Sequence, residues 1–384
     1  MAADKHKYPS VHCGLMRAAA RLLETEQPAA ARRYEPGTVE LLVSEAAAPD
    51  RVGDRQQGSG MHYFCAVTPD GLPVLPADFP GCFPNGKGAA APSPLTMAEA
   101  EYRMALSLER AGRYAPALQS LARAAHMIQD ICCPPHAAGL TYFSRYAMQH
   151  KRYEGQAAEI FWGKKKNGDP AAAAHTWAEA AAGLAPYDQY TNLVPDLSTA
   201  EGFLHRGGFI EICRQIATAS AAELPSVLSG DDKLREASIR RQLAASVAQT
   251  AALFAAFDRD AADPSIAVWQ ERTPYWLYSF GAKKNLYRDP LYLDFDENGD
   301  ITLHTLEGAT LCVTRMGGVR LTDPQPGMKT TFRFGCEPLL TLFPAGDQSK
   351  PIAYSGGRLF AASRFLLRGL RLTVHTSFAL IPDE

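Results

Sequence analysis

The stretch AHMIQDICCPPHAAGLTYFSRYAMQHKRYE, residues 125–154, contains five side chains that can bind a metal ion. These are His126, Asp130, His136, His150 and Glu154. Two pairs among them are separated by four positions, a spacing that places both side chains on one face of an α-helix. The stretch therefore predicts two helices, each of which carries one pair of ligands.

The corner between these helices is set by Cys132-Cys133-Pro134-Pro135. Proline lacks a backbone N–H and its ring clashes with the preceding turn, so the first helix must end here. His136 then approaches from a different direction, as the closing of a coordination sphere requires. A single histidine on an apolar helix is usually a packed core residue, but this many ligands in register favour a polynuclear zinc site, because mixed nitrogen and oxygen donors suit zinc.

Two upstream segments extend the pattern. Asp4-Lys5-His6-Lys7 is followed by His12, and Pro49-Asp50 is followed by Met61-His62-Tyr63-Phe64. Together with residues 126–154, these segments resemble the bacterial zinc-dependent phospholipases C, a family related to the clostridial alpha-toxins and the fungal zinc nucleases. The resemblance covers about residues 1–260 and lies at the ligand positions rather than between them.

The resemblance also implies how the ligands are shared among three zinc ions. One ion would be bound by Asp50, His62, His126 and Asp130, and a second by His136, His150 and Glu154. A third would be bound by His12, Asp130 and the amino terminus of the chain, so that Asp130 bridges two ions. Neighbouring ions lower the pKa of a water held between them and generate hydroxide at neutral pH, and we expect Asp50 to assist its attack.

Two of these assignments have rivals. The family chelates zinc with an N-terminal tryptophan, which is absent here; after removal of Met1, Ala2 would supply the amine instead, with His6 as the alternative ligand. Asp54 is the rival of Asp50. Asp50 is preferred because of its Ala48-Pro49-Asp50 context and its distance before His62.

The composition describes a soluble globular chain. It has 384 residues, of which 46% are hydrophobic and 21% charged, and a formal net charge of -2. This charge gives no general attraction to nucleic acid. No apolar run reaches the roughly 18 to 20 residues that span a bilayer, and residues 1–6 lack the apolar core of a signal peptide. The resemblance nevertheless implies a secreted or exported protein, whose signal has been removed or whose export follows another route.

Apolar periodicity predicts helices at residues 11–26, 95–130 with a break at 111–113, 146–162, 171–184, 207–219 and 232–257. Composition changes at residues 261–265, and alternation then predicts strands at residues 291–295, 301–305, 332–334 and 370–374. We therefore expect an α+β chain of two domains. An all-α zinc-dependent catalytic domain would occupy residues 1–260, and a β-sandwich-like domain that contacts membrane or substrate would occupy residues 266–384.

The segment from Asp294 to Asp300 resembles the start of a calcium loop. Position twelve of that loop is Thr305 rather than the glutamate that would bind calcium with both oxygens. Asn298-Gly299 between two alternating segments instead favours a tight β-hairpin. A Ca²⁺ site at the surface, linked to membrane docking, is the weaker alternative.

These features favour a phospholipase C that hydrolyses a phospholipid such as phosphatidylcholine through metal-bound hydroxide, giving diacylglycerol and a phosphorylated head group. Its partner would be a phospholipid membrane surface or micelle. Glu154 as the last ligand and the thirteen residues between His136 and His150 favour this reading over the alternative, a zinc-dependent nuclease or other phosphodiesterase. A third hypothesis is a non-enzymatic helical domain stabilised by zinc, but ligands shared among three ions leave open positions, which are typical of catalytic zinc.

Overall fold

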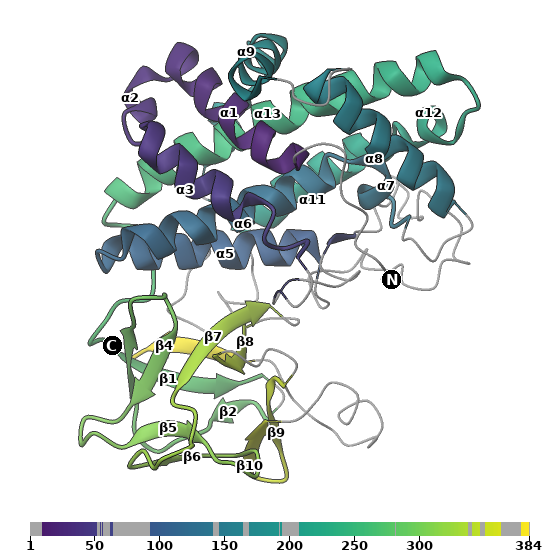
Figure 1. Cartoon of the computed structure of the whole chain (residues 1–384). Helices are drawn as coiled ribbons and strands as arrows, with labels where there is room; N and C mark the ends of the chain where they lie inside the picture. Colours follow the sequence, from purple (N-terminus) through teal and green to yellow (C-terminus); the bar gives the residue numbers. More distant parts are fainter. Residues whose placement is uncertain are drawn as a thin grey trace.

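The computed structural model describes residues 10–51, 54, 56, 62–63, 93–140, 146–163, 169–191, 193, 207–280, 282–336, 340–345, 350–361 and 378–383. Helices occupy the chain as far as Ala262, and strands follow from Pro274. Figure 1 shows the helical part stacked on the β-part, with helix α5 facing the strands. This order confirms the predicted α+β class, an all-α domain followed by a β-domain. Among the described helices, none is both long and apolar enough to cross a membrane.

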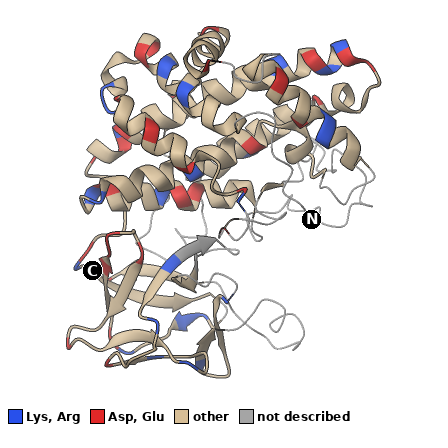
Figure 2. Cartoon of the chain, in the orientation of Figure 1, with Lys and Arg blue, Asp and Glu red and all other residues tan. Residues whose placement is uncertain are grey.

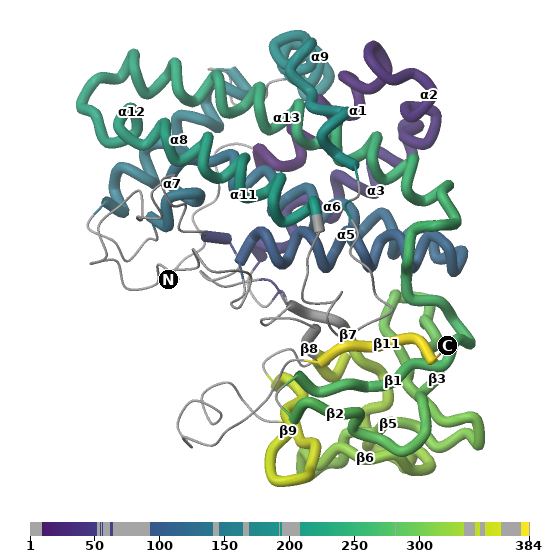
Figure 3. Tube along the Cα trace, turned by 180° about the vertical axis from the view of Figure 1, so that it is seen from behind, coloured from purple at the N-terminus to yellow at the C-terminus, as the bar shows by residue number. Residues whose placement is uncertain are grey.

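The helical part contains the following described elements: α1 (Val11–Glu26), α2 (Pro28–Ala31), α3 (Pro36–Ala46), α5 (Pro94–Arg110), α6 (Tyr114–Ile131), α7 (Pro134–Ala137), α8 (Ala147–Trp162), α9 (Pro170–Ala181), the 3₁₀ turn η1 (Tyr187–Gln189), α11 (Gly207–Ala221), α12 (Leu224–Leu228) and α13 (Asp232–Ala262). Acidic and basic side chains are interspersed along these helices rather than separated by sign (Figure 2). Helix α13 crosses the part seen from behind in Figure 3 and packs against α1, α6, α8 and α9.

Helices α5 and α6 form an antiparallel hairpin whose ends follow from the sequence. Ser93 and Thr96 cap the start of α5 reciprocally, each side chain hydrogen-bonding the other residue's backbone N–H. Gly112 has a φ of 73°, a left-handed conformation that suits glycine, and it separates the two helices where the break is predicted. Helix α6 ends at Ile131 and α7 begins at Pro134, which confirms the predicted corner.

The β-part contains β1 (Pro274–Ser279), β2 (Lys284–Asn285), β3 (Leu291–Phe295), β4 (Ile301–His304), β5 (Thr310–Val313), β6 (Gly318–Thr322), β7 (Thr331–Cys336), β8 (Leu340–Pro344), β9 (Ile352–Ser355), β10 (Arg358–Ala361) and β11 (Phe378–Pro382). All described pairings are antiparallel, in the order β2-β1-β11-β8-β7-β4-β5-β6-β10-β9. Strand β3 pairs with both β1 and β4, so the sheet folds back on itself around an apolar core. The predicted strand at residues 370–374 lies outside the described residues.

The turn between β3 and β4 is the predicted hairpin. Asp296 accepts hydrogen bonds from the backbone N–H groups of Asn298 and Asp300, and Gly299 has a φ of 74°. The guanidinium of Arg333 in β7 donates to the carboxylate of Asp300. The acidic side chains of this turn are therefore used in its own hydrogen bonds, as a hairpin requires.

The two parts share a core. Met104 and Leu108 of α5 and Ala117 of α6 pack in the same apolar cluster as the inward side chains of the strands. At one side of this contact, the Ser107 hydroxyl accepts a hydrogen bond of 3.1 Å from the backbone N–H of Trp269. At the other, Arg113 donates to the Phe295 carbonyl at 3.3 Å. The α5–α6 hairpin thus carries the β-part on its outer face while α6 contributes ligands on its inner face.

Candidate metal centre

Six segments bring the predicted side-chain ligands together. His12 lies in the first turn of α1, and Asp50 and His62 belong to the segment after α3. The remaining ligands lie on α6 (His126 and Asp130), α7 (His136) and α8 (His150 and Glu154). Ala2 and His6 lie outside the described residues. The ligand atoms form three groups, each within 4.8 Å: His12, His126 and Asp130; Asp50, His62 and His126; and His136, His150 and Glu154.

Asp130 stands at the centre of the cluster. One of its carboxylate oxygens, Oδ2, is 2.7 Å from Nδ1 of His62 and 3.3 Å from Nε2 of His126. The other, Oδ1, is 3.1 Å from Nδ1 of His136 and 3.8 Å from Nε2 of His12. The Asp130 side chain is 2% exposed. A carboxylate with imidazoles on both oxygens has the arrangement that a bridging ligand between two ions needs.

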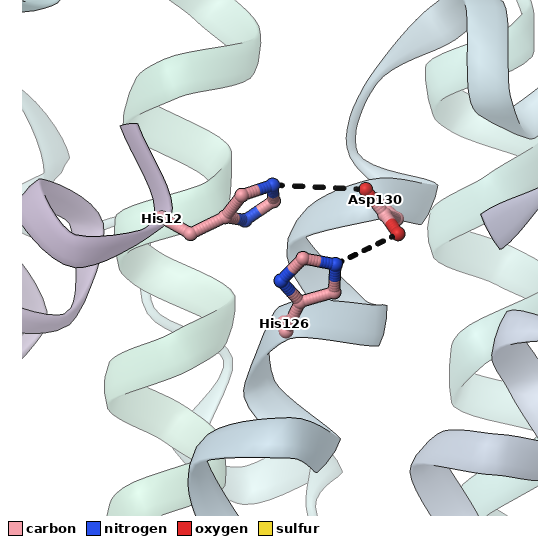
Figure 4. Close-up of side chains that lie close together, drawn as sticks. All are labelled: His12, His126 and Asp130. Atoms are coloured by element: carbon pink, nitrogen blue, oxygen red, sulfur yellow. Dashed lines mark ion pairs between the residues drawn. The ribbon is translucent and has the colours of Figure 1, made fainter. Parts of the chain in front are cut away.

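His12 reaches this cluster from a distant part of the chain. Its ring stacks on that of His126 with 4.0 Å between centroids, and both imidazoles face Asp130 (Figure 4). The helix α1 that carries His12 runs beside α6, so two residues 114 positions apart come to share one carboxylate. Only His126 and Asp130 of these three are neighbours on one helix, at the i and i+4 positions.

The orientation of three histidines tests whether a metal ion fits. Nδ1 of His126 lies 2.7 Å from the Ala46 carbonyl oxygen, and Nδ1 of His150 lies 2.6 Å from that of Leu140. Carbonyl oxygens only accept hydrogen bonds, so both Nδ1 atoms must be protonated. His12 is held in the same way, with Nδ1 at 2.8 Å from Oε1 of Gln129. This is the arrangement by which metal-binding histidines are oriented, with the other ring nitrogen left for the ion.

The inward nitrogens meet carboxylates rather than hydrogen-bond donors. Nε2 of His150 is 2.9 Å from Oε1 of Glu154, and Nε2 of His12 is 3.9 Å from Oδ2 of Asp50. In a neutral imidazole both atoms of such a pair are acceptors, so they repel each other unless a proton or a cation lies between them. Since several imidazoles converge here in a buried space, a divalent cation is the more economical solution, and the residues fit a metal ion.

The charge states of the buried carboxylates agree with this role. Burial opposes ionisation of Asp130, but His136, His126 and His62 outweigh it and hold the pKa of Asp130 well below its ordinary value. Burial likewise opposes ionisation of Glu154, yet hydrogen bonds from His136 and His150 lower its pKa. Burial and the neighbouring His126 lower the pKa of His12, which favours the neutral imidazole. Carboxylates and neutral imidazole are the forms that bind metal ions.

The geometry separates Asp50 from its rival Asp54. Asp50 is 3.9 Å from His62, His126 and His12, with its side chain 53% exposed. Asp54 points away from these histidines and binds the guanidinium of Arg123 with both carboxylate oxygens, each at 2.8 Å. The structure thus places Asp50, and not Asp54, among the candidate ligands.

Sequence reasoning overlooks three polar residues that support the ligands: Arg123 and Gln129 on α6, and Gln56 before His62. A signal for the first two was present. Arg123, His126, Gln129 and Asp130 recur on an otherwise apolar helix, and all four are buried. Buried polar side chains require partners, so Arg123 and Gln129 could have been assigned to the site together with the ligands.

Comparison with known proteins gives two solved structures of the same overall arrangement. No known family model matches the chain, and no curated protein sequence matches it. The chain is similar to the alpha-toxin from Clostridium absonum, with 12% identity and a TM-score of 0.49 over 100% of this chain and 99% of that chain. It is also similar to the Clostridium perfringens alpha-toxin from avian strain SWCP, with 14% identity and a TM-score of 0.47 over 99% and 98%. Identities this low do not assign an activity to the chain.

Proposed function

We propose that the chain is a zinc-dependent phospholipase C, which cleaves the bond between the glycerol oxygen and phosphorus of a phospholipid. The observation that supports it most directly is the central position of Asp130, whose two oxygens face histidines from four different segments. Such a carboxylate serves neighbouring ions, and neighbouring ions suit phosphoryl transfer. The His126–Glu154 motif, which resembles that of the zinc-dependent phospholipases C, indicates the substrate class.

The ligands divide into a closed side and an open side. Asp130, His126 and His150 are buried, at 0–2% exposure of their side chains. Asp50 and Glu154 have side chains that are 53% and 36% exposed. A phosphodiester would approach from the side of Asp50 and Glu154, while the buried residues hold the ions. Because Nδ1 of His126 is bonded to Ala46, its Nε2 can serve one ion only, and Asp130 then links this ion to the one beside His12.

Zinc, when bound, neutralises negative charge that develops on the phosphoryl oxygens and makes water more acidic. Asp50 is the residue placed to take up the proton of the attacking water, because it is an exposed carboxylate at the open side of the cluster. His12, His62 and His126 all lie 3.9 Å from its oxygens and keep it turned toward the cluster. Their positive character favours the carboxylate form that a general base needs.

The first experiment measures diacylglycerol release from mixed phospholipid micelles by the zinc-loaded chain, beside a chelated sample. We expect release that chelation abolishes and that zinc restores. A chain that holds about three zinc ions but releases no diacylglycerol would overturn the phospholipase assignment. Hydrolysis of single-stranded nucleic acid by the same sample would then assign it to the nucleases.

An Asp50→Asn variant tests the role of the exposed carboxylate. Removal of a general base typically costs about 100-fold or more in rate, so we expect a loss of that size in kcat. The high exposure of Asp50 means that the fold should be unaffected. Asp188→Asn, at an exposed position of η1, is the matched control and should retain full activity. Equal activity of the two variants would contradict the role of Asp50.

A further inference from the structure

The segment that carries Asp50 and His62 needs something to hold it against α6. Its described residues show few backbone hydrogen bonds: the N–H of Arg51 donates to the Ala48 carbonyl at 3.0 Å, and that of Asp54 to the Arg51 carbonyl at 3.0 Å. These are local turns, and they do not join the segment to the helix that bears His126 and Asp130. The side chain of Arg123 makes that connection.

Arg123 lies on the same face of α6 as the ligands, three positions before His126 and seven before Asp130. Its Nη1 and Nη2 donate to the two oxygens of Asp54 at 2.8 Å each, and Nη1 also donates to Oε1 of Gln56 at 3.0 Å. Its Nε donates to Oε1 of Glu45, the next-to-last residue of α3, at 2.6 Å. The Arg123 side chain is 8% exposed. A planar guanidinium can satisfy several acceptors in fixed directions, which a lysine cannot do.

The partners of Arg123 lie on both sides of Asp50 along the chain. Glu45 precedes Asp50 by five residues and Asp54 follows it by four, so one guanidinium fixes both ends of the turn that presents the Asp50 carboxylate. The Asp54 side chain also accepts the backbone N–H of Gln56 at 2.8 Å, which extends the fixed segment toward His62.

Gln56 passes this constraint on to His62. Its side-chain oxygen is held by Arg123, and its Nε2 donates to Oε1 of Glu101 on α5 at 2.6 Å. Its backbone carbonyl oxygen lies 3.1 Å from Nε2 of His62, whose other nitrogen then faces Asp130 at 2.7 Å. The residue is fully buried. The orientation of the His62 ring therefore depends on a residue that Arg123 holds in place.

We propose that Arg123 is a positioning residue of the metal centre, which holds Asp50 and His62 over His126 and Asp130 through Glu45, Asp54 and Gln56. This inference rests on the proposed metal function of the site. It predicts a selective effect, because the group His136, His150 and Glu154 is built from α7 and α8, whose side chains Arg123 does not contact.

Zinc titration of the full-length chain, with a competing chromophoric chelator, tests the proposal. We expect Arg123→Met to weaken zinc binding at one of the sites at least about 10-fold, the size typical for loss of a residue that orients a ligand, while the tightest remaining site is retained. Arg123→Lys should show a similar loss, because a lysine cannot bind Asp54 with two parallel hydrogen bonds. Asp54→Asn should weaken the same site to a smaller extent.

Arg33→Met is the matched control. Arg33 is also a partly buried arginine between two carboxylates, Glu109 and Asp258, and neither belongs to the metal centre. Its loss should lower the unfolding temperature and leave zinc affinity unchanged. Should Arg123→Met lower the unfolding temperature as Arg33→Met does and bind zinc like the unaltered chain, Arg123 would be a structural ion-pair residue and the proposal would be overturned.

Two further results keep the test decisive. Far-ultraviolet circular dichroism shows whether Arg123→Met retains its helices; where it does not, Asp54→Asn, which preserves the volume of the side chain, carries the comparison. Unchanged zinc affinity of a folded Asp54→Asn variant would then overturn the proposal. Failure of the unaltered chain to bind zinc would instead overturn the metal centre itself, so the two ideas fail by different observations.

Discussion

Gln129 determines which nitrogen of His12 faces the metal centre. Its Oε1 lies 2.8 Å from Nδ1 of His12, and its Nε2 donates to Oγ1 of Thr250 on α13 at 3.1 Å. The Thr250 bond fixes the amide so that its oxygen points to the imidazole, and the imidazole must then carry its proton on Nδ1. We predict that Gln129→Ala weakens zinc binding at the His12 group about 10- to 100-fold, because the ring loses its orienting partner.

Isothermal titration of the apo chain with Zn²⁺ measures this change. Gln215→Ala, at an exposed position of α11, removes the same side chain away from the site and should bind zinc like the unaltered chain. A Gln129→Ala variant with the affinity of this control would show that packing alone orients His12.

At the level of single residues, the sequence predicted what depends on local spacing. His126 and Asp130, and His150 and Glu154, are helical neighbours, so their pairing follows from the helix period. The choice between Asp50 and Asp54 depends instead on Arg123, which is 69 positions from Asp54 and reaches it only in the folded chain. Spacing along the segment contains no information about such a partner.

Elements were predictable where strong end signals coincide with apolar periodicity. Helix α1 spans Val11–Glu26, the predicted range, and the corner at Pro134 lies where two prolines require it. Helix α3 was missed: it is short, and most of its residues remain partly exposed, so its apolar pattern is weak. Yet α3 supplies the Glu45 side chain that binds Arg123 and leads into the Ala46 carbonyl that orients His126. Its contribution to the site becomes visible only in three dimensions.

The close approach of α1 and α8 depends on Gly14, two positions after His12. A Cβ atom at this position would lie 2.2 Å from Cε1 of Phe161 and 2.9 Å from Cη2 of Trp162. The Phe161 ring stacks on Trp177 with 5.7 Å between centroids, so it cannot swing away freely. We predict that Gly14→Ala lowers the free energy of unfolding by about 1–3 kcal/mol, the usual cost of overpacking, despite the better helix propensity of alanine.

Gly155→Ala provides the opposite sign in the partner helix. Gly155 lies within α8, is exposed, and would place its new methyl group in open space. Alanine should therefore stabilise the chain there by up to about 1 kcal/mol through propensity alone. Thermal or urea unfolding of both variants compares the two effects directly. If Gly14→Ala were as stable as Gly155→Ala, the aromatic contact would not limit the packing of α1.

At the scale of the whole molecule, the order of the two parts could be predicted, but their docking could not. Helical periodicity gives way to alternation after residue 265, and this change alone predicts an all-α domain followed by a β-domain. The contact between them uses Leu108, which reads as an ordinary apolar helix position in the sequence. That it packs with the strands, and not with the helical core, becomes apparent only from the apolar cluster that both parts share.

Gly299 tests how strongly this contact couples the two parts. It lies in the β3–β4 turn with a φ of 74°, and a Cβ atom there would lie 3.1 Å from Leu108 Cδ1 and from Pro116 Cβ. Gly308, in the β4–β5 turn, has a φ of 94° and no neighbour within 4 Å of its Cβ position. Alanine costs about 1–2 kcal/mol at either turn, because L-residues disfavour this conformation, but only Gly299→Ala also presses on the α5–α6 hairpin.

We therefore predict a lower unfolding temperature for Gly299→Ala than for Gly308→Ala in differential scanning calorimetry. Because the two parts share apolar core residues, the unaltered chain and Gly308→Ala should each unfold in one transition, whereas Gly299→Ala should broaden or divide it as the β-part separates from the hairpin. Identical transitions in the two variants would mean that the cluster around Leu108 yields to an added methyl group, and that the helical part keeps its ligands in place without firm docking of the β-part.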